Sequence, residues 1–359
     1  MAAYYLSGYS GAKRKQRLRI RRTISIVFIV LVLVACVIGY KMIYMNNVWL
    51  GDQTSEDVFI PTNANFDKVK NLLYQKGLII NRKSFEWVAQ KKAYPSHIRP
   101  GKYLVKRGMS NNTLINMLRS GKQEPVKLVF NNIRTKMDFA QRISEQIEAD
   151  SASIIKLLND KSYVKKFGLN TENILVTFIP NTYETWWNIT ADELITRMNK
   201  EYDKFWTEER KEKAKKIGLT VPQVSILASI VEKETNKDSE KPRIAGVYLN
   251  RLKYGMLLEA DPTLVWALGD FSIKRVLNEY KKLDSPYNTY KYFGLPPGPI
   301  CLPSIASIDA VLNFEKHYYL YFCAKDDLSG FHNFAYNYEQ HSMNARKYQQ
   351  ALDRMNIKR

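Results

Sequence analysis

The sequence of 359 residues predicts an α+β protein with a single N-terminal transmembrane helix, a small α+β module and a larger mixed α+β domain. Three observations predict this organisation. A long uncharged apolar run lies near the N-terminus, helical and strand-like patterns alternate over residues 60–125, and capped helices with proline- and glycine-rich turns follow from residue 220. The length allows two or three domains and a sizeable buried core.

The apolar run covers residues 23–40 and contains 18 residues without a charge. Residues 23–44 can span a membrane if Lys41 extends its amine toward the headgroups. Seven Lys or Arg residues and no acid precede the run. The positive-inside rule therefore predicts a single-pass protein of the cell (inner) membrane, with a cytoplasmic N-terminus at residues 1–22 and the remaining chain on the outer face.

A lipoprotein is the alternative, because residues 33–36 resemble a processing box that would place a lipid on Cys36. The segment after Cys36 stays apolar, whereas a mature lipoprotein continues into a small polar tether. A cleaved signal peptide also has a shorter apolar core. The sequence favours an uncleaved signal anchor.

The formal net charge of +20 suits an anionic partner, such as an acidic polymer or lipid headgroups. The predicted topology argues against nucleic acid, and no glycine-rich nucleotide loop is present. Cys301 and Cys323 allow one disulfide at most. Four scattered histidines and the absence of a CxxC pair predict neither a metal site nor a cofactor.

The small module begins after a polar connector at residues 46–61. Apolar spacing predicts two short helices within residues 65–92, a turn and strand at 100–106, and a helix over 113–118 that Gly121 ends.

Residues 126–219 are predicted to form a helical connecting region that begins with a strand at 126–130. The charged segment 208–216 is expected to be a solvated helix face rather than a binding patch. The loop at 178–187 carries several aromatic residues, which are expected to pack in the core, with an exposed stacking surface as the alternative.

Residues 220–235 are predicted to form one capped, mostly apolar helix. Thr220 and Gln223 have capping-box spacing, and Pro222 is tolerated in the first turn. At about 100° per residue, Glu234 falls on the apolar face, whereas Glu232 faces the opposite way.

An apolar surround and the negative end of the helix dipole both disfavour a carboxylate, so the sequence predicts a raised pKa for Glu234. Glu232 is expected to be solvated or paired. The competing interpretation is that these acids only form a charged helix end.

Beyond this helix, residues 243–252 are predicted to form another helix, and the prolines of 294–299 a rigid wall. A strand-like segment at 318–324 lies near His332 and His341.

Three motifs in this order, LASIVEKET, VYLNRLKYGMLLEADPTLVWALG and SPYNTYKYFGLPPGPI, resemble the catalytic domain of the MltG/YceG-like endolytic murein transglycosylases. PGKYLVKRGMSNNTLINMLRSGKQ resembles the LysM-like module that precedes this domain. The resemblance covers most of residues 60–350 and implies a LysM-like module at 60–125 and a catalytic domain at 220–355. Two departures are Asn181, where the family usually carries Asp, and Cys301 in a turn that is usually more polar.

The resemblance implies that Glu234 is the catalytic acid. The candidate substrate-binding residues are Glu232, Asn250, Arg251, Asp261, Thr263, Tyr287, Asn288 and Thr289. Structural roles are the alternative for each, with Asp261 capping a turn before Pro262 and Asn288 holding a loop.

The implied function is cleavage of the β-1,4 bond between N-acetylmuramic acid and N-acetylglucosamine in nascent peptidoglycan strands, with 1,6-anhydro ends as products and termination of glycan elongation as the role. The expected partners are the glycan strands, the membrane and peptidoglycan synthases. Two alternatives remain: a muramidase-type hydrolase that uses a second acid, and a non-catalytic peptidoglycan-binding scaffold of the elongation or division machinery.

Overall fold

A computed structural model describes residues 4–273 and 276–354 of the chain. The chain divides into two units. The first contains the residues up to Pro125 together with Trp186–Asn188, and the second contains Val126–Thr185 and the residues from Ile189 onward.

The first unit begins with the long helix α1, Tyr4–Tyr44. Its segment Arg14–Tyr44 has a mean hydropathy of 2.8 in its most apolar stretch and is long enough to cross a membrane. The predicted span at 23–44 lies inside this helix, and the basic flank continues the same helix toward the N-terminus. The amide of Asn111 donates a hydrogen bond of 2.9 Å to the carbonyl of Met42, which ties the end of α1 to the module that follows.

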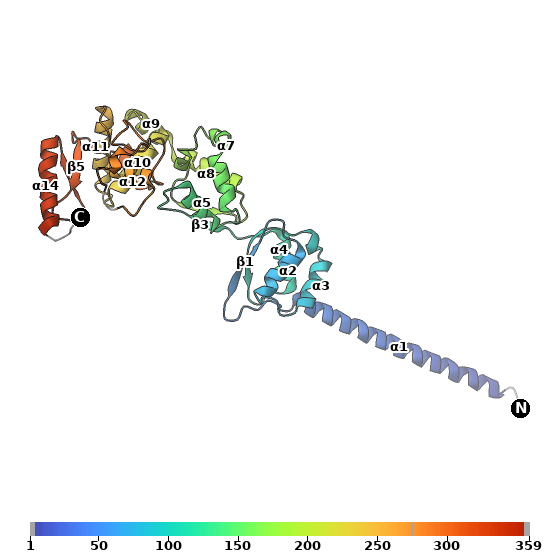
Figure 1. Ribbon diagram of the computed structural model, residues 1–359. Helices are drawn as coiled ribbons and strands as arrows, with labels where there is room; N and C mark the ends of the chain where they lie inside the picture. Colours follow the sequence, from blue (N-terminus) through green and yellow to red (C-terminus); the bar gives the residue numbers. More distant parts are fainter. Residues whose placement is uncertain (1–3, 274–275, 355–359) are drawn as a thin grey trace. The chain divides into compact units, whose positions relative to one another are not determined.

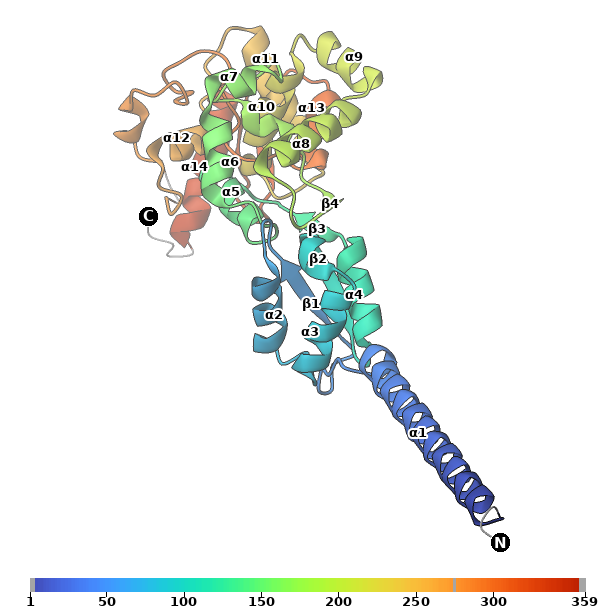
Figure 2. The ribbon, with the colours of Figure 1, turned by 90° about the vertical axis from the view of Figure 1, so that its right-hand side faces the viewer.

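The module after α1 packs four short helical segments against a two-stranded antiparallel sheet (Figure 2). Its elements are β1 (Ser55–Ile60), α2 (Phe66–Gln75), α3 (Arg82–Lys91), the 3-10 helix η1 (Tyr94–Ser96), β2 (Gly101–Lys106) and α4 (Asn111–Ser120). The predicted helix pair and the strand at 100–106 are confirmed. The prediction of a polar connector through residue 61 was wrong for its second half, because Val58 and Ile60 alternate inward on β1 and are buried.

The second unit contains two further antiparallel strand pairs and most of the helices. Before the 220s its elements are β3 (Val126–Val129), α5 (Lys136–Ser144), α6 (Ser151–Asn159), α7 (Lys161–Lys165), η2 (Ile174–Thr177), β4 (Thr182–Thr185), α8 (Ala191–Phe205) and α9 (Glu208–Lys216). After them come α10 (Val221–Glu234), α11 (Lys241–Lys253), α12 (Asp261–Leu268), η3 (Tyr280–Lys282), α13 (Ile305–Leu312), β5 (Tyr321–Ala324), β6 (His332–Ala335) and α14 (Tyr338–Arg354).

One strand was missed in the aromatic loop at 178–187. Residues of this loop form β4, which pairs with β3 so that Tyr183 lies opposite Leu128. Phe178 and Tyr183 are buried, as expected for core aromatics, whereas Trp186 is half exposed. The pairing partner precedes the loop by more than fifty residues in the sequence, so the local pattern gave no indication of it.

Residues 126–219 and the residues after 220 share one apolar core. Helix α10 lies within this core and packs against α9, α11, α12 and α13 (Figure 1). β5 and β6 form a hairpin against which α14 packs. This arrangement fixes the C-terminal end of α10, where the two predicted acids lie.

Candidate active site

Helix α10 begins as the sequence predicts. The hydroxyl of Thr220 accepts a hydrogen bond from the backbone N–H of Gln223, and the side chain of Gln223 accepts one from the N–H of Thr220 at 2.8 Å. This capping box satisfies two N–H groups that would otherwise have no partner. The helix is then buried from Val224 to Val231, so its two acids emerge from the core at its last turn.

Glu232 lies on one side of this last turn and is held by three side chains. Its carboxylate accepts hydrogen bonds from the hydroxyls of Ser304 and Ser307 and pairs with the ammonium of Lys241 at 3.2 Å. Burial by itself would raise the pKa of Glu232, but the serine hydrogen bonds and Lys241 outweigh it and lower this pKa. Glu232 therefore links α10 to α11 and α13, and its position gives no support to the prediction that it contacts substrate.

Glu234 lies on the other side and has a different environment. The phenol of Tyr248 on α11 donates a hydrogen bond of 2.5 Å to its carboxylate. Burial raises the pKa of Glu234 to about 7, the Tyr248 hydrogen bond opposes this rise, and the negative charge of Asp261 adds to it. The predicted raised pKa is confirmed, and burial is its main cause. A carboxylic acid with this pKa can both hold and release a proton near neutral pH.

Tyr248 remains a neutral hydrogen-bond donor. Burial, together with the neighbouring charge of Glu234, raises the pKa of its phenol well above the ordinary value. A tyrosine that is this difficult to ionise positions the Glu234 carboxyl group and does not compete with it for the role of acid.

Two cavities share Glu234 as a lining residue. The larger has a volume of about 950 Å³ and the smaller about 310 Å³, and both are lined by Glu234 and Asp261. Glu234 therefore borders both binding spaces. A linear polymer that entered one cavity and left by the other would carry an internal bond past Glu234.

Aromatic side chains form much of the larger cavity. Phe293 and Tyr338 are about 70% exposed, at 71% and 69%, which is unusual for large aromatic side chains. Exposed rings in a cavity offer flat apolar surface to a ligand. His332 and His341 also line this cavity. Burial, followed by the charge of Arg251, lowers the pKa of His341, so this imidazole is neutral at pH 7.

Asp261 is the first residue of α12, and Pro262 follows it in the first helical turn. Its carboxylate accepts a hydrogen bond from the phenol of Tyr290. The helix has Ala260 at its N-cap with no side-chain capping bond, so Asp261 does not cap a turn before Pro262. Of the residues predicted to bind substrate, Asp261 lies beside Glu234 and faces both cavities.

Arg251 also lines the larger cavity, but its guanidinium group is already engaged. It donates to the carbonyls of Leu320, Leu257 and Leu258 at 2.7 to 3.1 Å and pairs with Glu259 at 2.9 Å. The side chain is 7% exposed. Its main role in this geometry is to hold the cavity wall in place.

Three of the other predicted residues, Thr263, Asn288 and Thr289, are buried and hold the loops around α12. Thr263 and Thr289 share a hydrogen bond of 2.8 Å between their hydroxyls. Asn288 donates to the carbonyls of Lys281 and Leu283 and accepts from the N–H of Tyr290, so it does hold a loop. None of these residues lines either cavity at Glu234.

Tyr287 and Asn250 are likewise engaged away from the acid. The ring of Tyr287 lies 3.9 Å from that of Trp266, and its hydroxyl donates to Glu172. Asn250 donates to the carbonyls of His317 and Tyr319 and borders a separate cavity. Neither position supports direct contact with a ligand at Glu234.

Tyr248 and Tyr290, the two phenols that donate hydrogen bonds to the acids of the site, were not predicted from the sequence. Both lie inside motifs that were recognised, but helical periodicity reports which way a side chain faces within one helix and not which neighbouring element it meets. Cys301 is buried against α10 with its thiol directed at the carbonyl of Ser229, and both it and Cys323 are free thiols.

The fold and this site define a class of protein: a chain with a membrane-length helix, a small α+β module and a domain in which a glutamic acid with a raised pKa, Glu234, lines two cavities. The profile of the YceG-like family matches residues 58–347, and the chain belongs to this family.

Two curated relatives carry the name endolytic murein transglycosylase. The protein of Bacillus subtilis (strain 168) is 28% identical over 293 residues, which cover 77% of this chain and 80% of that protein. The protein of Streptococcus pneumoniae serotype 2 is 28% identical over 322 residues, which cover 80% of this chain and 57% of that longer protein. A crystal structure of a YceG-like protein from Listeria monocytogenes matches with a TM-score of 0.55 and 28% identity, covering 81% of this chain and 98% of that one.

Proposed function

We propose that this protein is a lytic transglycosylase that cleaves the β-1,4 bond between N-acetylmuramic acid and N-acetylglucosamine inside peptidoglycan strands. The observation that carries the proposal is Glu234, whose pKa of about 7 leaves it protonated often enough at neutral pH to act as a general acid. The names of the curated relatives support the same reaction class.

The reaction requires one group that first donates a proton and later accepts one. Glu234 protonates the glycosidic oxygen as the bond to the muramyl anomeric carbon breaks, and the N-acetylglucosamine hydroxyl departs. The resulting carboxylate then accepts the proton of the muramyl C6 hydroxyl, whose oxygen bonds to the same anomeric carbon. The product is a 1,6-anhydro ring, and Glu234 is protonated again.

This pathway needs a single carboxyl group because the nucleophile belongs to the sugar, whereas an ordinary glycosidase uses two carboxyl groups. Glu232 is poorly placed to be a second one, since two serines and Lys241 occupy its carboxylate. Tyr248 supports the cycle by hydrogen bonding to the carboxylate that forms after the first proton transfer.

The two cavities that share Glu234 as a lining residue support endolytic cleavage. A strand that occupies the cavity of about 950 Å³ and continues into the one of about 310 Å³ places an internal linkage at the acid.

The N-terminal helix supports membrane anchoring. With its basic flank in the cytoplasm, the active site lies on the outer face, where it can reach newly made strands. The same proposal includes that the protein terminates glycan elongation and contacts peptidoglycan synthases.

The test is digestion of purified peptidoglycan strands by the full-length protein in detergent, followed by mass spectrometry of the fragments. Anhydro ends are lighter than hydrolysed ends by one water and resist borohydride reduction. Glu234→Gln should abolish cleavage, whereas the exposed control Glu212→Gln should leave it unchanged. Cleavage by Glu234→Gln would show that another residue is the acid.

A muramidase-type hydrolase is the second candidate, because Asp261 lines both cavities together with Glu234 and could serve as a second carboxylate. Reducible ends in the digest would favour it. If the wild-type protein binds strands and releases no fragment, the non-catalytic scaffold is the better description.

A further inference from the structure

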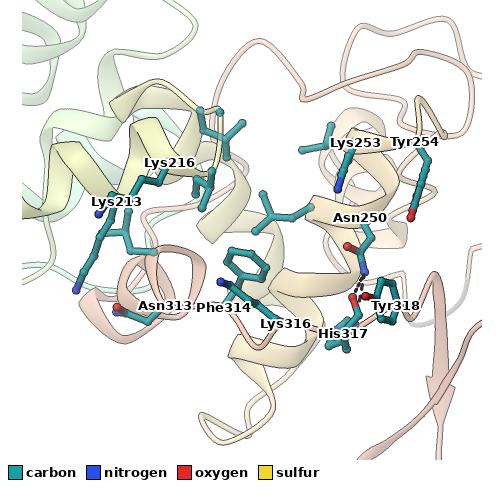
Figure 3. Close-up of a pocket in the computed structure, with 16 residues that line it drawn as sticks. Lys213, Lys216, Asn250, Lys253, Tyr254, Asn313, Phe314, Lys316, His317 and Tyr318 are labelled. Carbon is teal, nitrogen blue, oxygen red and sulfur yellow. Dashed lines mark hydrogen bonds between the residues drawn. The ribbon is translucent and has the colours of Figure 1, made fainter.

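A separate cavity of about 930 Å³ lies in the second unit and shares no lining residue with the two cavities at Glu234. Helix α11 separates them: Tyr248 and Arg251 line the larger Glu234 cavity, whereas Asn250 and Lys253 line this one. Figure 3 shows that its labelled side chains come from α9, from α11 and from the segment after α13.

This cavity is lined by four lysines and by no acidic residue among the residues described around it. They are Lys213 and Lys216 on α9, Lys253 on α11 and Lys316 after α13. Lys213 already pairs with Glu209 at 2.8 Å. The structure shows no ion pair between any other described residue and Lys216, Lys253 or Lys316. Three exposed lysines without an ion-pair partner among the described residues therefore border one hollow.

The walls that carry these lysines are fixed. Arg210 binds both carboxylate oxygens of Asp309 at 3.0 and 3.2 Å, which ties α9 to α13. Asn250 donates to the carbonyls of His317 and Tyr319 and so holds the segment after α13 against α11. The charged face of α9, which the sequence predicts to be merely solvated, is thus one wall of a preformed hollow.

Both ring nitrogens of His317 are engaged in hydrogen bonds to the backbone. Its Nδ1 accepts a hydrogen bond from the N–H of Tyr319 at 3.1 Å, so the proton is on Nε2, which faces the carbonyl of Arg243 at 2.9 Å. Gly246 permits this contact, because a Cβ at that position would come within 2.6 Å of the imidazole.

We propose that this cavity binds a ligand with two linked phosphate groups. Three ammonium groups that line one cavity without an ion-pair partner among the described residues favour a ligand of similar opposite charge. One phosphate monoester carries a charge of about −1.5 to −2 at neutral pH, which is too little for three lysines. Two linked phosphates match them.

The choice of lysine also favours phosphate over carboxylate. Planar carboxylates are recognised best by the fork of an arginine, whereas lysine acts as a point charge that suits phosphate oxygens in any orientation. No arginine lines the described part of the cavity. Tyr254 and Tyr318 are 57% and 78% exposed at its border, where they can contact the organic group that carries the phosphates.

The experiment is calorimetric titration of the full-length protein in detergent with inorganic pyrophosphate at low salt. The test variant combines Lys216→Gln, Lys253→Gln and Lys316→Gln. The matched control replaces three exposed lysines elsewhere in the second unit, Lys156, Lys165 and Lys200, with glutamine. We expect the test variant to bind pyrophosphate at least about tenfold more weakly, because only this variant loses lysines that line the cavity. The control loses the same net charge elsewhere and should bind as wild type does.

Two further titrations identify the source of the ligand and its chemical class. Titration with vesicles that carry a lipid diphosphate, compared with titration with free pyrophosphate, distinguishes a lipid headgroup from a soluble ligand. The proposal is supported if the wild type binds either probe and the test variant loses that binding. Equal binding by the test and control variants overturns it, as does binding of neither probe by the wild type. Citrate that binds as tightly as pyrophosphate also overturns it, in favour of a carboxylate ligand. Peptidoglycan cleavage by the test variant should be unchanged, so failure of this proposal is distinguishable from failure of the proposed function.

Discussion

Replacing Glu234 with glutamine tests the central physical claim independently of catalysis. Glutamine keeps the size of the side chain and an oxygen that accepts the hydrogen bond of Tyr248, but it removes the ionisable proton. In the folded protein the pKa of Glu234 rises from 4.5 to about 7, so folding favours the protonated form. The stability that this preference supplies is complete below pH 4.5 and is lost as the pH rises through about 7.

The size of this effect follows from the pKa. One pKa unit corresponds to about 1.36 kcal/mol, so the rise from 4.5 to about 7 makes the ionised wild-type protein less stable by about 3 kcal/mol. The Glu234→Gln variant has no carboxyl group to ionise at this position, so it does not lose this stability as the pH rises. We therefore expect the variant to gain about 3 kcal/mol relative to wild type between about pH 4 and about pH 8, and to lose at least about a hundredfold in cleavage rate.

The assay is urea unfolding of full-length wild type and variant in the same detergent at both pH values, followed by tryptophan fluorescence. Comparing the two proteins at each pH cancels the titration of every other group. If the difference in unfolding free energy is the same at both pH values, the carboxyl group titrates as it does in water, and the argument for a retained proton fails.

Three further substitutions separate positioning from chemistry at the same site. Tyr248→Phe removes a donor to the carboxylate, so the pKa of Glu234 should rise further and the alkaline limb of the kcat/KM profile should move to higher pH; a move to lower pH would contradict this. Asp261→Asn removes a nearby negative charge, so the same limb should move to lower pH, whereas complete loss of activity would assign Asp261 a catalytic role. Glu232→Gln removes the negative charge that pairs with buried Lys241 and should lower the unfolding free energy by about 1 to 3 kcal/mol. It should leave the alkaline limb of the kcat/KM profile in place. A shift of this limb would place Glu232 in the catalytic site.

Much of the local structure was predictable from the sequence because its causes are local. The capping box of α10, the membrane-length apolar run of α1 and the paired short helices of the first unit all depend on residues a few positions apart. Strand β1 was missed because its identity depends on pairing with β2, more than forty residues later.

The sequence alone determined that one acid of the 232–234 pair faces apolar surroundings and the other faces away, since helical geometry sets the angle between them. Only the tertiary structure decided what each acid meets: Tyr248 and Asp261 around Glu234, and Ser304, Ser307 and Lys241 around Glu232. It also decided that Thr263, Asn288 and Thr289 hold loops. A hydroxyl or amide group in a motif can bond equally well to a ligand or to the backbone, and the choice depends on which atoms the fold brings within about 3 Å.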